Sequence, residues 1–190
     1  MSTQAPVRIA IAGEGGQGVQ AVAEILTEAA YEEGKEAIYM PNFGLEQRGG
    51  VSIAFVQIGE KRIVSPKFKT GDIVVALSDR AVKRMQVYVG PETTFIYDSY
   101  IEGIEEDLPK NAKKVLAIPA IEVSKKELHP RVFNVIIMGA VIGATGVVSI
   151  ERAKAALESK LAYKFEKDPQ LKELNFKALE RGKELVEQAL

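Results

Sequence analysis

Residues 7–19 read VRIAIAGEGGQGV, an apolar segment that runs directly into a glycine-rich turn. The β-branched and small apolar residues from Val7 to Ala12 predict a buried strand, and the glycines between Gly13 and Gly18 predict a turn with little side-chain cover. From Val19 onward, apolar residues recur with helical spacing. The sequence therefore predicts a strand, a glycine turn and a helix in succession, and the unpaired amides of the first helical turn would suit an anion.

The same turn satisfies the GxGxxG pattern through Gly13, Gly15 and Gly18. A nicotinamide or flavin site would also need an Asp or Glu near the end of the second strand, to bind the adenosine ribose. That strand is expected over residues 36–40 and leads into Pro41 and Asn42, with no acid at its tip. This disfavours a dinucleotide site. A turn that merely lets helix and strand pack closely remains an open alternative.

Length and composition indicate one domain over residues 1–190, large enough to bury a single core. The 25 Lys and Arg nearly balance the 26 Asp and Glu, so no global field favours nucleic acid or an anionic membrane. The absence of cysteine excludes disulfides, thiolate zinc sites and cysteine-ligated iron–sulfur clusters. With a single histidine, His129, a redox metal held by this chain is not expected, and His129 is interpreted as structural or solvated.

No membrane segment or secretion signal is expected. The N-terminal residues lead into the first strand without a long apolar stretch, which favours a cytoplasmic location. The long apolar run from Val132 to Val148 falls short of the roughly 20 residues that a bilayer span needs. Glycines interrupt this run, and we interpret it as a buried, closely packed helix over residues 134–146.

Strand and helix patterns alternate along the rest of the chain. We expect a hairpin of residues 51–58 and 61–64 around Gly59-Glu60, strands at 72–77, 93–97 and 114–118, and helices at 79–88, from Ser149 onward and near the C-terminus. This order predicts an α/β fold: a three-layer α/β/α sandwich with a mostly parallel, mixed sheet, a Rossmann-like start and an inserted β-hairpin.

The second informative segment is residues 42–50, NFGLEQRGG, which is polar, rich in glycine and contains a single cation, Arg48. A loop of this composition between strands is expected at the mouth of the sheet. Arg48 offers a planar fork to a phosphate or a partner carboxylate, and Glu46 would orient it or hold the loop. Gln17 would bond to a ligand, across an interface or within its own turn.

Four segments together resemble the gamma subunit of 2-oxoacid:ferredoxin oxidoreductases. They are GEGGQG at residues 13–18, PNFGLEQRGG at 41–50, NVIIMGAVIGATG at 134–146 and NFKALERG at 175–182. The resemblance spans nearly the whole chain. It implies a non-redox subunit of an enzyme that oxidatively decarboxylates a 2-oxoacid such as pyruvate or 2-oxoglutarate, forms acyl-coenzyme A and reduces ferredoxin.

The resemblance also implies the partners and cofactors. Thiamine diphosphate and iron–sulfur clusters would lie in alpha, beta and delta (ferredoxin-like) subunits, and this chain would contact coenzyme A or a partner. It implies no catalytic or metal-binding residues here; the expected contact residues are Gly13, Gly15, Gly16, Gln17, Gly18, Asn42, Glu46, Arg48, Gly49 and Gly50. The alternatives are a free-standing NAD(P)- or flavin-binding oxidoreductase and a non-catalytic adenine-nucleotide-binding module.

Overall fold

The computed structural model describes residues 5–43 and 50–190. The strands are β1 (Val7–Gly13), β2 (Glu36–Asn42), β3 (Ser52–Gly59), β4 (Ile73–Ala76), β5 (Thr94–Asp98) and β6 (Lys114–Ile118). The α-helices are α1 (Val19–Glu32), α2 (Asp79–Met85), α3 (Ala120–Glu127), α4 (Phe133–Thr145), α5 (Ile150–Lys167) and α6 (Pro169–Ala189). Short 3-10 helices are η1 (Gln86–Tyr88), η2 (Glu105–Asp107) and η3 (Pro130–Val132).

The strands form one mixed sheet in the order β2-β3-β1-β4-β5-β6. Strands β1, β4, β5 and β6 pair in parallel, and β3 pairs antiparallel with both β1 and β2. Among the described strands, β3 alone therefore opposes the common direction. The predicted α/β fold with a mostly parallel, mixed sheet is confirmed.

The expected hairpin partner at residues 61–64 is wrong, because these residues form no strand. Strand β3 already has a neighbour on each side: Gly59 pairs with Glu36 of β2, and Ile58 pairs with Val7 of β1. No edge of β3 is left for a third strand. The antiparallel insertion is instead formed by β2 and β3 themselves, on either side of residues 43–51.

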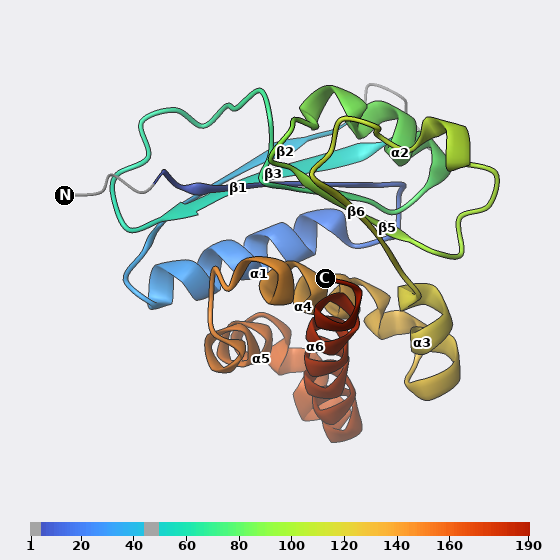
Figure 1. Cartoon of the computed structure of the whole chain (residues 1–190). Coiled ribbons are helices and arrows are strands. Elements are labelled where there is room, and N and C mark those ends of the chain that lie inside the picture. Colours follow the sequence, from blue (N-terminus) through green and yellow to red (C-terminus); the bar gives the residue numbers. More distant parts are fainter. Residues whose placement is uncertain (1–4, 44–49) are drawn as a thin grey trace.

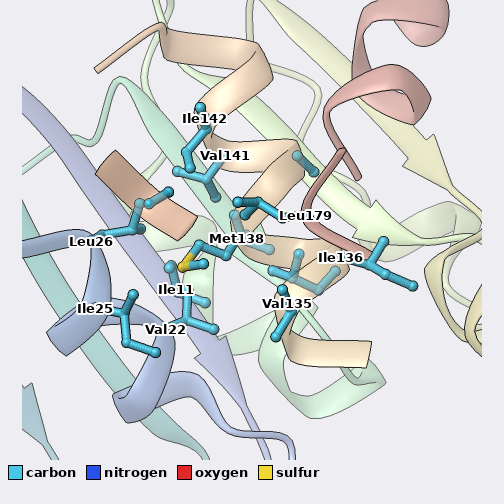
Figure 2. Packing of buried hydrophobic residues seen from close by; sticks show 14 of the residues in the cluster. Ile11, Val22, Ile25, Leu26, Val135, Ile136, Met138, Val141, Ile142 and Leu179 are labelled. Carbon is cyan, nitrogen blue, oxygen red and sulfur yellow. The ribbon is translucent and has the colours of Figure 1, made fainter. Parts of the chain in front are cut away.

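Helices cover the two faces of the sheet unequally. On one side, α1 and α4 lie against the sheet and α5 and α6 lie beyond them, whereas α2 and η1 lie on the opposite side (Figure 1). Strand β1 follows this division, since Ile9 and Ile11 belong to the core under α1 and α4, and Ala10 and Ala12 belong to the core under α2. Figure 2 shows Ile11 beside Val22 of α1 and side chains of α4 and α6.

Two glycines allow α4 and α6 to cross with their backbones in contact. A Cβ atom on Gly139 would lie 2.0 Å from the carbonyl oxygen of Leu179, and one on Gly182 would lie 1.9 Å from that of Ile136. Both distances are far inside van der Waals contact, so neither position has space for a side chain. The glycines that interrupt the apolar run therefore serve close packing, as the sequence predicts.

The ends and the buried face of the last two helices follow simple rules. The Ser149 hydroxyl accepts from the Arg152 amide at 3.2 Å and caps α5. Helix α6 docks mainly through Ala178, Leu179, Leu185 and Val186, whereas Ala189 at its end is exposed. In the described part of the chain, no helix combines the length and apolar composition needed to cross a membrane.

Candidate ligand and partner site

The glycine turn follows β1, whose neighbour in the sheet is β4, and the helices that follow these two strands lie on opposite faces of the sheet. From β1 the chain passes through α1 to β2, and from the neighbouring β4 it passes through α2 toward β5. Helices α1 and α2 lie on opposite sides of the sheet (Figure 1). In open α/β sheets, such a switch between adjacent parallel strands leaves a crevice at their carboxyl ends, where ligands bind. Residues 13–18 and 77–79 border this crevice.

Gln17 fixes the shape of the glycine turn. Its Oε1 accepts from the Glu14 amide at 2.7 Å, and its Nε2 donates to the Leu77 carbonyl at 2.8 Å. The side chain thus closes its own turn and ties that turn to the end of β4. Gly13 is required beside it, because a Cβ there would lie 2.6 Å from Gln17 Oε1. Of the roles expected for Gln17, the structure shows the bond within its own turn, made by Oε1, while Nε2 bonds to the more distant Leu77.

Gly18 begins α1 and brings it against the start of α4. Its φ of 72° is in the left-handed region, and a Cβ would lie 2.5 Å from Asn134 Nδ2. The N-terminal ends of α1 and α4 are therefore neighbours at the turn. No acidic residue occupies the first turn of α1, and its N-cap residue, Gly18, has no side chain that could cap it. The first-turn amides of an α-helix lack intrahelical acceptors, so this end of the sheet offers donors to an anion.

Gly15 and Gly16 form the exposed tip of the turn. Among the described residues, no heavy atom outside the immediate chain neighbours lies within 4 Å of a Cβ built on either residue. Gly16 has a φ of 91°, which favours glycine, but Gly15 does not have a positive φ. Neither packing nor a left-handed backbone thus requires a glycine at position 15. A bare backbone at this point suits the close approach of a ligand or partner.

One ion pair bridges the two borders of the crevice. Arg80 Nε of α2 lies 4.0 Å from Glu14 Oε1, and both side chains are partly exposed. The pair is long and solvated, so it contributes at most about 1 kcal/mol to stability. Arg80 compensates the charge that Glu14 would otherwise present to an anion at the turn.

The second predicted segment meets the same edge of the sheet. Gly13 pairs with Ser52 and Asn42 pairs with Ile53, so the end of β2 and the start of β3 lie level with the glycine turn. Asn42 is exposed and lines a cavity of about 220 Å³ on the α2 side, with Met40, Phe55, Lys67, Phe68 and Tyr88. Gly50 is partly buried. Glu46, Arg48 and Gly49 lie outside the described residues.

Gln20 connects the segment of the glycine turn to β2 and β3, and the sequence did not predict this contact. Its Nε2 donates to Ser52 Oγ at 2.6 Å and to the Ile53 carbonyl at 3.1 Å, and its Oε1 accepts from the Tyr39 hydroxyl at 2.5 Å. One side chain from the first turn of α1 thus joins β2 and β3. The helical pattern placed Gln20 off the apolar face, and no local signal identified its partners.

Asp98 is a buried carboxylate at the end of β5, on the same edge of the sheet. It is 0% exposed, and its two oxygens accept from the amides of Tyr100 and Ile121, each at 2.8 Å. Burial raises the pKa of Asp98 above its ordinary value, more than these amides lower it. Asp98 thereby fixes the start of α3 and the turn after β5.

In residues 5–43 and 50–190, no group of three or more His, Cys, Asp or Glu is placed to hold a metal ion. His129 Nδ1 accepts from the Arg131 amide at 3.1 Å and caps η3, so it has a structural contact, as the sequence predicts.

The fold and this edge of the sheet define an α/β domain with a glycine turn at its switch point. Comparison identifies it further: the chain belongs to the Pyruvate ferredoxin/flavodoxin oxidoreductase family, whose model matches residues 8–185. The pyruvate/ketoisovalerate oxidoreductases common subunit gamma of Pyrococcus abyssi is 34% identical over 157 residues, 80% of this chain and 85% of that protein. The resemblance seen in the sequence is confirmed.

Some relatives are longer than this chain, and others match it over nearly their whole length. Ketoisovalerate oxidoreductase subunit VorA of Methanothermobacter thermautotrophicus is 30% identical over 178 residues, which cover 94% of this chain but only 36% of VorA. The keto/oxoacid ferredoxin oxidoreductase gamma subunit of Geobacter sulfurreducens has a TM-score of 0.81 at 28% identity and covers 98% and 99% of the two chains. A 2-oxoglutarate:ferredoxin oxidoreductase of Magnetococcus marinus has the same fold over 32% of its chain (TM-score 0.88, 22% identity). Within the family, this chain is of the gamma type, and a free-standing dinucleotide enzyme is not favoured.

Proposed function

We propose that the chain is the non-redox gamma subunit of a thiamine-diphosphate-dependent 2-oxoacid:ferredoxin oxidoreductase, located in the cytoplasm. The assembly would decarboxylate a 2-oxoacid, form an acyl-coenzyme A and reduce ferredoxin. Alpha, beta and delta subunits would hold the thiamine diphosphate and the iron–sulfur clusters. This chain contributes a shaped surface, which agrees with its lack of cysteine.

The observation that carries the proposal is the open backbone at Gly15, beside the first-turn amides of α1. A phosphate or pyrophosphate of coenzyme A fits such a site, because backbone N–H groups and the helix dipole both favour negative charge. The Magnetococcus structure of the same fold contains coenzyme A and succinyl-CoA, which supports this ligand class. The full predicted contact set adds Asn42, Gly50 and the undescribed Glu46, Arg48 and Gly49 to the turn.

Replacing Gly15 with alanine tests this role of the turn. We expect unchanged folding, because the new Cβ meets no neighbour within 4 Å in the part of the chain that the structure describes. In the assembled enzyme we expect the Michaelis constant for coenzyme A to rise about tenfold, as the loss of about one charge-assisted hydrogen bond would produce. Steady-state kinetics of the reconstituted complex measure this.

Glu92→Ala is a suitable control, since Glu92 is exposed and lies near the amino end of β5, at the opposite edge of the sheet. A weaker affinity between subunits with an unchanged Michaelis constant would assign the turn to a partner chain. If Gly15→Ala changes neither quantity, the glycine turn serves packing alone and the proposed ligand role fails.

The isolated chain is expected to show no turnover. In its described residues we find no metal cluster, and the sequence contains no thiol, so the chemistry would belong to cofactors in other chains. The purified chain is assayed with a 2-oxoacid, coenzyme A and a low-potential electron acceptor, alone and after addition of the companion subunits. Activity should appear only in the mixture. Turnover by the lone chain would contradict its assignment as a non-redox subunit.

A further inference from the structure

The segment between β3 and β4 presents a row of cations to solvent. We call Lys61, Arg62, Val64, Lys67 and Lys69 the basic strap; all five are exposed. We propose that the basic strap docks onto an acidic face of a companion subunit. The inference rests on the proposed function, because it assumes that the chain works in an assembly, and it goes further by naming the surface and the chemistry of the partner.

The strap is held firmly on the sheet. Gln57 of β3 is 5% exposed, and its Nε2 donates to the Ser65 carbonyl at 2.7 Å. Ile63 is buried, and the ring of Phe68 packs edge-on against Phe55 with centroids 5.5 Å apart. These anchors alternate with the outward cations. The cations are therefore presented by an ordered backbone, which lowers the entropy cost of binding a partner.

The charges of the strap have no ion-pair partner in the described part of the chain. Residues 61–71 contain no Asp or Glu, and within the described ranges none of the four strap cations makes an ion pair. Asp72, at the end of the segment, pairs with Arg8 at 2.8 Å. In contrast, α5 carries Lys154 paired to Glu180 and Lys160 paired to Glu24. A local excess of unpaired cations on a chain of net charge −1 favours a specific acidic contact over general attraction to polyanions.

The shape of the strap favours a protein over a small anion. The cations form two pairs, Lys61-Arg62 and Lys67/Lys69, separated by apolar and small residues, whereas a single phosphate needs donors that converge. Val64 lies between the pairs and is 93% exposed. An exposed aliphatic side chain flanked by charges has the composition of an interface centre with a polar rim.

The strap is also continuous with the proposed partner edge. Lys67 and Phe68 line the same 220 Å³ cavity as Asn42, the last residue of β2. On this face Phe55 of β3 packs against Tyr88 of η1, with ring centroids 5.0 Å apart. A companion subunit that contacts the end of β2 would therefore reach the strap without leaving the surface.

The test is the quadruple variant Lys61→Glu, Arg62→Glu, Lys67→Glu and Lys69→Glu, assembled with the purified companion subunits. The matched control is Arg152→Glu, Lys164→Glu, Lys167→Glu and Lys177→Glu, which makes the same change in net charge at exposed positions of α5 and α6. At low salt we expect the strap variant to bind at least about tenfold more weakly and the control to bind within about twofold of the wild type.

The salt dependence and the variant Val64→Ser distinguish the electrostatic contribution to binding from the apolar one. Wild-type affinity should fall as NaCl rises from about 50 to 300 mM, because screening weakens solvent-exposed pairs, and the strap variant should lose this dependence. Val64→Ser should weaken binding severalfold without changing the salt dependence. Melting curves of the isolated variants establish that each is folded.

The outcomes are distinct. If the wild type assembles and the strap variant assembles equally well with the same salt dependence, the inference is overturned while the proposed function stands. If the strap variant loses only an affinity for a short single-stranded DNA that the wild type binds, the surface is a polyanion site and the inference is also overturned. If the wild-type chain does not assemble with the companions at all, the proposed function fails and takes this inference with it.

Discussion

Replacing Gly182 with alanine is expected to destabilise the chain by about 3 kcal/mol or more, at the upper end of the range for overpacking a core. The new Cβ would lie 1.9 Å from the carbonyl oxygen and 2.7 Å from the carbonyl carbon of Ile136 in α4. These are backbone atoms of a regular helix, which cannot rotate away as the end of a flexible side chain can. Helices α4 and α6 would have to separate, and the core between them would open.

Helix propensity acts in the opposite direction and is too small to change the sign. Alanine is favoured over glycine in a helix interior by about 1 kcal/mol. That gain is smaller than the expected packing cost. Because Gly139 makes the reciprocal contact with Leu179, at 2.0 Å, Gly139→Ala should be destabilising for the same reason.

Thermal and urea unfolding of the chain measure the effect. A loss of 3 kcal/mol corresponds to a melting temperature lower by roughly 6–12 °C for a chain of this size. Gly15→Ala is the control, since it adds the same methyl group where no neighbour lies within 4 Å. An unchanged or higher melting temperature for Gly182→Ala would show that the two helices do not cross with their backbones in contact.

Local sequence signals predicted most elements of the fold but not all of their partners. The strand, turn and helix at residues 7–32 were predictable from a strong periodic pattern, and the apolar helix near residues 134–146 was predictable from a long apolar run that ends at a glycine. The expected return strand at residues 61–64 was wrong for a non-local reason. Gly59-Glu60 is a plausible hairpin turn, but β1 and β2 occupy both edges of β3. Strands from distant parts of the chain compete for the same pairing edge, and a local sequence pattern contains no information about these competitors.

In the candidate site, too, the local segments were predictable and the contacts between them were not. Glycines at 13–18 predicted the turn, and the composition of residues 42–50 predicted a neighbouring loop; the register of β1, β2 and β3 brings the ends of both segments to one edge. The polar contacts within the site were not predictable. Gln20 reaches Ser52 and Tyr39, and Asn134 packs on Gly18, through contacts between residues far apart in sequence. Such contacts depend on the assembled fold.

Replacing Asp98 tests the buried contact at the end of β5. The carboxylate is 0% exposed and accepts from the amides of Tyr100 and Ile121. Asp98→Ala should leave both amides without this acceptor and cost about 2–3 kcal/mol, since each unsatisfied buried donor costs roughly 1–3 kcal/mol and removal of a buried charge returns part of it. Hydrogen exchange should then quicken first at Tyr100 and Ile121.

The pH dependence of stability distinguishes the charge of Asp98 from its shape. Because burial raises the pKa of Asp98, the folded chain binds this proton more tightly than the unfolded chain does. The stability that protonated Asp98 contributes is therefore fully present below its ordinary pKa of about 3.9 and is lost as pH rises through the higher folded pKa. Asp98→Asn keeps the shape, leaves one amide facing an NH2 group and removes the titration. Urea unfolding of both proteins from about pH 4 to 7 should show the difference in stability between wild type and Asp98→Asn shrinking as pH rises. A difference that is constant or grows over this range would mean that the charged carboxylate is the better partner for the amides of Tyr100 and Ile121.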